Sequence, residues 1–258
     1  MKYSCTFFVS NPGAQLEVSR KLVNSIAQGI EANSRAANRQ PDPWTLTHHI
    51  FRDVAPASQP ASNDNAPTAH AHSYQQLLHL SYLSPDRTYT FVHPPEPNQA
   101  PLEMTQIPRQ QTDSHYNMLL TWWAALWTPQ RTLEVPHGVV YKVRDFTLYI
   151  GELHSKRQGQ QSANVLSPGV VVCITTTCGR ADNDLPSAPS LAEPLAPEDF
   201  EGVQHDIRGL WAHLNNGVDF GKAETREFMQ VAQDFDGKKD QEQEAVVRMW
   251  CEALRTRG

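Results

Sequence analysis

The sequence predicts an α+β protein built on an antiparallel sheet of about eight strands, either strongly curled or closed into a β-barrel, with helices packed on it. Two observations support this class. Short runs that alternate apolar and polar residues recur along the chain, as expected of strands with one buried face. Stretches with helical spacing lie between and after these runs. Curling or closure is the economical arrangement because it reduces the number of unpaired strand edges.

The first 107 residues contain five of the predicted strands. Alternation predicts strands over Tyr3–Val9, Trp44–Ile50, Tyr74–Leu83, Thr88–His93 and Leu102–Ile107. Between the first two, apolar residues at helical spacing predict an amphipathic helix over about residues 14–30. A polar link that ends at Pro41 and Pro43 separates this helix from the second strand.

A helix with two apolar stripes is predicted between Asp113 and Pro129. The first stripe contains Tyr116, Leu119, Leu120, Trp123, Leu126 and Trp127. The second stripe, on the opposite side, contains Met118, Trp122 and Ala125. One sheet covers only one side of a helix, so the second stripe predicts a protein–protein interface. The alternative, in which the C-terminal helices cover it through Trp211 or Trp250, stays open.

The stretch from Arg131 to Leu153 predicts the framework of the sheet. We expect a strand, a corner at Pro136-His137-Gly138, a second strand, a reversal at Arg144-Asp145 and a third strand in which Gly151 marks a bulge or bend. A β-branched strand over Gly169–Thr177 follows. Helical spacing then predicts three helices, whose apolar residues lie within Phe200–Leu214, Thr225–Met229 and Val246–Leu254.

Composition limits the function. The chain has 258 residues and 39% hydrophobic content, and we expect one domain over 1–258 with mobile Pro- and Ser-rich loops near 55–73 and 178–197. A net charge of -6 without a basic stripe argues against direct nucleic-acid binding. The chain has no apolar run of membrane-spanning length and no signal peptide, so we expect no membrane partner. Four cysteines without framework spacing predict reduced intracellular thiols.

Catalytic patterns are absent from the predicted strands. A tunnel-type, metal-dependent phosphohydrolase is the alternative for a barrel, but it needs Glu-x-Glu pairs on its strands to hold a divalent metal. The one such pair, Glu242 and Glu244, falls in the last predicted helix. His48 and His49 near Asp53, and His70 and His72 in the first loop, are interpreted as framework and solvated residues. We therefore expect no catalytic residue, no metal and no cofactor.

The order of several motifs resembles a known family. Trp44, His48 and Arg52-Asp53 are followed by Leu80-Ser81-Tyr82, the tryptophan-rich helix and VPHGVVYKVRDFTLYIGE. This order resembles the fungal form of Mediator complex subunit 20, whose members carry a strand pair written roughly as VPxGxVYxVxDFxxxIGD. The matching positions are Val135, Pro136, Gly138, Val140, Tyr141, Val143, Asp145, Phe146, Ile150 and Gly151. Glu152 replaces the final Asp, Arg144 stands where Gly is common, and the Gly169 strand lacks an expected acidic residue.

The resemblance implies a fold, partners and a location. It implies a barrel-like fold paired with the similarly folded subunit 18, and a helix of subunit 8 that tethers the pair to the head module of Mediator. The chain would then be a non-enzymatic coregulator of transcription by RNA polymerase II in the nucleus, in contact with other head-module subunits.

Overall fold

The computed structural model describes most of the chain. Described are residues 2–54, 71–95, 103–156, 165–177, 197–230 and 239–255, with the side chains of 197–199 and 239–241 left out. The loops predicted near 55–73 and 178–197 lie outside this part, apart from residues 71–73 and 197. His70 and Cys178 lie outside it too.

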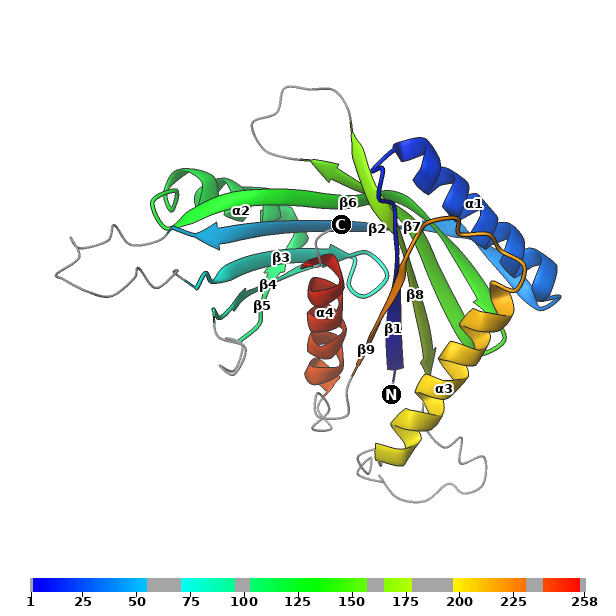
Figure 1. Ribbon diagram of the computed structural model, residues 1–258. Coiled ribbons are helices and arrows are strands. Elements are labelled where there is room, and N and C mark those ends of the chain that lie inside the picture. The colour runs from blue at the N-terminus through cyan, green and yellow to red at the C-terminus, as the bar shows by residue number, and fades with distance from the viewer. Residues whose placement is uncertain are drawn as a thin grey trace, which may run out of the picture. The chain divides into compact units, whose positions relative to one another are not determined.

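The described residues form nine strands and four α-helices, which confirms the α+β class. In chain order these are β1 (Lys2–Ser10), α1 (Leu16–Asn33), β2 (Ala37–Asp53), β3 (Tyr74–Leu80), β4 (Arg87–His93), β5 (Thr105–Pro108), the 3-10 helix η1 (Arg109–Gln111), α2 (Thr112–Thr121), β6 (Trp127–Val143), β7 (Phe146–Lys156), β8 (Leu166–Thr177), α3 (Pro197–Leu214), β9 (Thr225–Met229) and α4 (Lys239–Arg255) (Figure 1). The sheet order is β5-β4-β3-β2-β6-β7-β8-β1-β9. The order begins with β5 and ends with β9, and these two end strands do not pair with each other. The described sheet is therefore open rather than a closed barrel.

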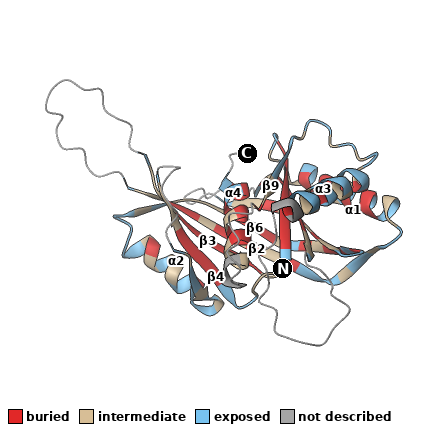
Figure 2. Cartoon of the chain, turned by 90° about the horizontal axis from the view of Figure 1, so that it is seen from below, coloured by how far each residue is buried: buried red, intermediate tan, exposed pale blue. Residues whose placement is uncertain are grey.

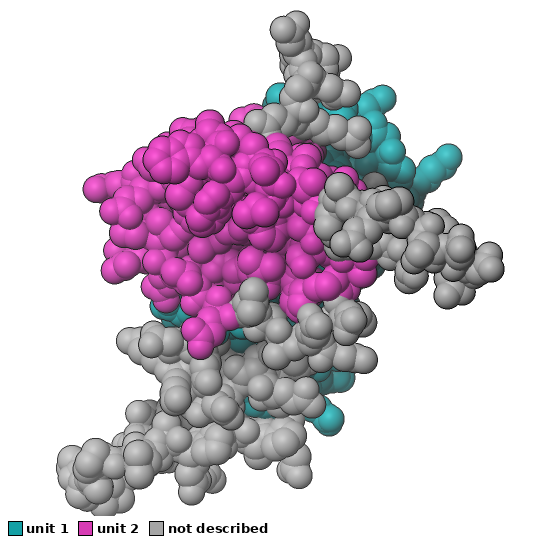
Figure 3. All heavy atoms as spheres, turned by 90° about the vertical axis from the view of Figure 1, so that its left-hand side faces the viewer, with its two compact units in different colours: residues 1–44, 135–154, 165–258 teal, residues 45–134, 155–164 magenta. Residues whose placement is uncertain are grey.

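Contacts divide the chain into two compact units, coloured in Figure 3. Unit 1 comprises residues 1–44, 135–154 and 165–258, and unit 2 comprises 45–134 and 155–164. Strands β2 and β6 each contribute residues to both units. The single-domain organisation expected from the sequence stays a prediction.

Unit 1 is built from paired strands covered by three helices. Strand β1 pairs antiparallel with β8 on one side and with β9 on the other. Ile26 and Ile30 of α1 are fully buried, and Phe7 of β1 stacks on Trp211 of α3 with ring centroids 4.6 Å apart. Figure 2 shows buried residues along the strands and on one side of α1, and in α4 eight of the residues from Ala245 to Leu254 are buried. Cys5 and Cys251 are buried free thiols, and Cys173 is buried as well.

Unit 2 is an antiparallel meander with a small core. Residues Leu46–Arg52 of β2 pair with β3, and residues Tyr74–Leu78 of β3 pair with β4. Phe51, Leu77 and Leu119 are fully buried, and Tyr116, Leu120 and Trp127 pack against them. The inward stripe predicted for the helix after Asp113 is therefore confirmed at its N-terminal end.

The predicted corner at Pro136-His137-Gly138 is wrong, because β6 runs through it without a break. Gly138 is needed for close packing instead: a Cβ there would lie 2.0 Å from Nε1 of Trp44. Gly151 is likewise no bend, since β7 continues through it; a Cβ there would lie 2.4 Å from Cγ1 of Val135, so its absence makes room for that side chain. The reversal at Arg144-Asp145 is confirmed, and Arg144 adopts a φ of 53° at the position where glycine is common in the family pattern.

Two other boundaries differ from prediction. The helix after Asp113 ends at Thr121, and β6 begins at Trp127 and passes through Pro129, which does not terminate a helix. Residues 225–229 form β9 rather than a helix. Their pairing with β1 decides this, and the side-chain Oε1 of Gln230 accepts a 2.6 Å hydrogen bond from Ser4 N–H just beyond the strand.

Candidate protein interface

The segment between α2 and β6 exposes large apolar side chains. We call residues 122–126, Trp122-Trp123-Ala124-Ala125-Leu126, the aromatic turn. Trp122 is 85% exposed, Leu126 is 60% exposed and Trp123 is 41% exposed. Exposed apolar residues that occur singly are ordinary, whereas a cluster of them marks an interaction surface.

Backbone hydrogen bonds hold the aromatic turn in one conformation. The N–H groups of Trp122 and Trp123 both donate to Met118 O, at 3.0 and 3.1 Å, which closes the end of α2. Leu126 N–H and Trp127 N–H both donate to Trp123 O at 2.9 Å, which forms a second single turn. Val54 N–H, just beyond β2, donates to Leu126 O at 2.9 Å. The exposed side chains therefore project from an ordered backbone, which lowers the entropy cost of binding.

The residues on either side of the turn are fixed in the core of unit 2. The Tyr116 ring lies 4.4 Å from the His49 ring and 5.5 Å from the Phe51 ring, centroid to centroid. Trp127 packs on the same cluster at the start of β6. The aromatic turn is thus supported at both ends, while its own side chains face outward.

The three residues predicted as an interface do not form one helical stripe. Met118 lies in α2 and is half-buried, whereas Trp122 and Ala125 lie in the aromatic turn and are exposed. That Met118, Trp122 and Ala125 contact a partner protein stays a prediction.

Trp123 and Leu126 were expected in the core stripe, and their exposure was missed by periodicity. The sequence does carry a signal that could have indicated this exposure: it has no Asp, Glu, Lys or Arg from Ser114 to Gln130. Such a stretch holds more apolar residues than one short helix can bury.

Trp211 and Trp250, the residues of the alternative in which the C-terminal helices cover the stripe, both pack within unit 1, and that alternative stays a prediction. Trp250 of α4 is fully buried in unit 1, with its ring 5.8 Å from that of Trp44. Trp211 stacks on Phe7.

The histidines of β2 do not form an acid–base pair with Asp53. His48 Nε2 lies 3.1 Å from Gln76 Oε1, and burial lowers the pKa of His48 to about 3. His49 Nδ1 lies 2.9 Å from Thr132 Oγ1, and burial lowers its pKa to about 4. Asp53 Oδ1 contacts His72 Nδ1 at 2.7 Å instead. Both strand histidines are therefore neutral near pH 7 and serve as framework residues.

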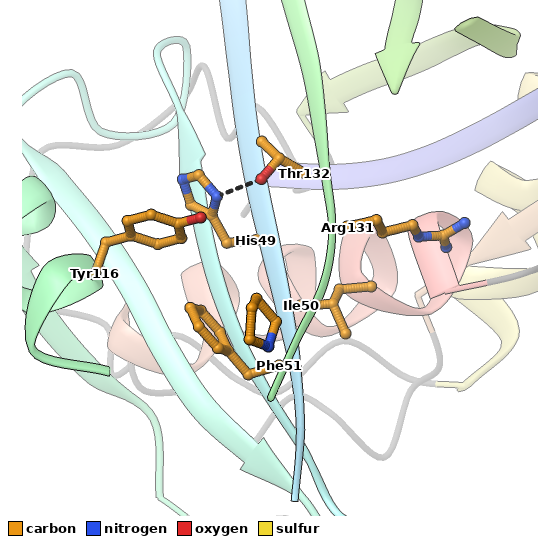
Figure 4. Close-up of a pocket in the computed structure, with 7 residues that line it drawn as sticks. His49, Ile50, Phe51, Tyr116, Arg131 and Thr132 are labelled. Atoms are coloured by element: carbon orange, nitrogen blue, oxygen red, sulfur yellow. Dashed lines mark hydrogen bonds between the residues drawn. The ribbon is translucent and has the colours of Figure 1, made fainter. Parts of the chain in front are cut away.

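The cavity beside His49 is too small for a substrate. It has a volume of about 10 Å³ and is lined by His49, Ile50, Phe51, Tyr116, Pro129, Arg131 and Thr132 (Figure 4). One water molecule needs about that much space.

Other described features give no support to a metal or membrane site. Within the described residues, no three His, Cys, Asp or Glu side chains come together as metal ligands. No described helix is long and apolar enough to cross a membrane.

Comparisons with known proteins identify a family. Residues 1–163, more than half of the chain, match the model of the TATA-binding related factor (TRF) of subunit 20 of the Mediator complex. A search of curated proteins found no match. Among solved structures, the chain is similar to the PH1819 protein from Pyrococcus horikoshii OT3, with a TM-score of 0.36, 11% identity, and coverage of 87% of this chain and 93% of that one.

Proposed function

Because the chain belongs to the Mediator subunit 20 family, we propose that it acts in the head module of Mediator as the non-enzymatic partner of subunit 18. The family assignment makes it a Mediator subunit that functions in the regulation of transcription. The finer placement is our proposal: a heterodimer with subunit 18, tethered by a helix of subunit 8 through subunit 18, in contact with other head-module subunits and located in the nucleus.

The aromatic turn is the surface we assign to subunit 18. The observation that supports this assignment is Trp122, which is 85% exposed on an ordered backbone, with Ala125 also exposed and Met118 half-buried. Cores of protein interfaces are enriched in Trp and Met and depleted of charged residues. Residues 114–130 contain no Asp, Glu, Lys or Arg, as such a core requires.

The exposed area of Trp122 sets the size of the expected effect. A tryptophan side chain buries up to about 250 Å², so 85% exposure leaves about 200 Å² for a partner to cover. At about 25 cal/mol per Å², covering it contributes about 5 kcal/mol before the costs of association are subtracted. A central tryptophan truncated to alanine therefore loses about 2–4 kcal/mol of binding free energy, within the range of interface hot spots.

Co-purification with subunit 18 tests the proposal. The full chain is co-expressed with tagged subunit 18 as wild type, Trp122→Ala and Trp122→Glu, and the amount retained on the tag is measured. Both variants should keep the wild-type circular dichroism, because the Trp122 side chain is 85% exposed. Both should be retained far less, with Trp122→Glu lost most completely, because it places a charge in an apolar interface.

The matched control is Val18→Glu, an equally drastic change at a residue of α1 that is 39% exposed. It should co-purify as the wild type does. Wild-type chain that fails to bind subunit 18 would refute the pairing, whereas normal retention of both Trp122 variants would refute only the assigned surface. Hydrolysis of tripolyphosphate with magnesium or manganese above a boiled control would overturn the non-enzymatic role.

A further inference from the structure

We propose that Pro41 and Pro43 keep an open edge of β2 from pairing with a β-strand of a second copy of this chain. The inference concerns unit 1 and is independent of the aromatic turn. It explains why two prolines occur in a long strand, a position that normally disfavours proline.

Hydrogen bonds with β3 show which way the backbone groups of β2 point. Thr45 N–H donates to Ser81 Oγ at 2.8 Å, and Thr45 O accepts from Ser81 N–H at 3.0 Å. Asp53 N–H, eight residues further on, donates to Ser73 O at 3.1 Å. Alternate residues of a strand direct their N–H and C=O groups to the same side, so the odd-numbered residues of β2 face the β3 side. Pro41 and Pro43 are odd-numbered and share this side.

The N-terminal part of β2 has no described strand on that side. Its sheet neighbours are β3 and β6, and pairing with β3 covers Leu46–Arg52. Among the described strands, none therefore pairs with residues 38–44 on the side of Pro41 and Pro43. Both prolines are exposed.

Proline removes the donors that such a strand would need. An added strand gains stability from a ladder in which it both donates to and accepts from the edge. Of the odd-numbered residues between 38 and 44, Arg39 alone has an N–H group. Proline costs β2 nothing in its own sheet, because the missing donors lie on the side away from β6. Prolines on exposed edges are an established way to prevent association between edges.

A double substitution restores the donors. The full-length Pro41→Thr/Pro43→Thr variant adds two N–H groups to the edge and raises β-propensity. We expect it to fold with the wild-type circular dichroism and to shift towards twice the wild-type mass in light scattering as its concentration rises. The new amides at positions 41 and 43 should exchange hydrogen slowly in the associated form and fast on dilution.

The matched control is Gln40→Thr/Asp42→Thr, which raises β-propensity in the same stretch at positions that face β6. It adds no donor to the edge and should keep the wild-type mass at every concentration. Three results would each overturn the proposal: a proline variant of unchanged mass with fast-exchanging amides, equal association of both double variants, or unfolding of the proline variant. Unfolding counts against it because outward-facing N–H groups leave the ladder with β6 intact.

Discussion

Adding one methyl group at Gly138 tests how β6 and Trp44 pack in unit 1. A Cβ at Gly138 would lie 2.0 Å from Trp44 Nε1, 2.4 Å from its Cδ1 and 2.5 Å from its Cε2. Trp44 is 1% exposed, and its indole N–H donates to Ile150 O at 3.0 Å. The Gly138 φ lies outside the left-handed region, so the substitution is opposed by the indole and not by backbone strain.

The expected cost follows from the displacement that the methyl group forces. Carbon atoms approach to about 3.5 Å, so the ring must move by about 1.5 Å. Overpacking of this kind costs about 1–3 kcal/mol. The moved indole also loses its bond to Ile150 O, for about 1 kcal/mol more. We therefore expect Gly138→Ala to lower the free energy of unfolding by about 3 kcal/mol.

Urea unfolding followed by far-ultraviolet circular dichroism measures this cost. The midpoint should fall while the slope with urea stays unchanged, because the surface exposed on unfolding is the same. If the chain forms the single domain predicted from its sequence, the curve has one transition. That outcome is expected because β2 and β6 each contribute residues to both units.

Two controls isolate the contact with Trp44. Gly209→Ala adds the same methyl group in α3 with nothing within 4 Å, and should be neutral or stabilising by up to about 1 kcal/mol. In a Trp44→Leu background, Gly138→Ala should cost much less, because the obstructing ring is gone. A cost below about 1 kcal/mol in the wild type, or an equal cost in both backgrounds, would refute the steric explanation.

Two further predictions concern pH and the β6–β7 turn. Burial lowers the pKa of His48 to about 3, so the unfolded chain takes up a proton below about pH 6.5 that the folded chain does not. Stability should therefore fall by about 1.4 kcal/mol per pH unit for this residue as pH drops from 6.5 towards 4, and His48→Asn should reduce that slope. Arg144 has a φ of 53°, a backbone conformation that costs Gly less than Arg, so Arg144→Gly should raise the free energy of unfolding by about 0.5–1 kcal/mol, whereas Asp145→Gly should lower it. An unchanged slope in the His48 variant, or a loss of stability in Arg144→Gly, would contradict these expectations.

Alternation and family pattern determined much of the fold without coordinates. Residues 146–150 alternate as expected, with Leu148 and Ile150 fully buried in β7. The hairpin at Arg144-Asp145 and the helices α1, α3 and α4 also follow from local periodicity. Such signals succeed because one side of each element faces the core of its own unit, which fixes the residue period.

Local sequence could not decide how short apolar stretches pair. Residues 225–229 fit a helix as well as a strand, and pairing with β1 selects the strand. Likewise, the aromatic turn has helical spacing, but α2 ends at Thr121 and β6 begins at Trp127. The exposure of Trp122, and hence the candidate interface, follows from that boundary.

The meaning of proline and glycine also depended on tertiary structure. Pro41 and Pro43 were expected to end a link, yet they lie inside β2, because proline is tolerated where the missing N–H faces no neighbouring strand. Gly138 was expected to turn the chain, yet it admits the ring of Trp44, which lies far away in sequence. Residue period is a local property that a sequence displays directly. The side to which a backbone N–H points, and the ring that fills the space left by a missing Cβ, are set by segments distant in the chain.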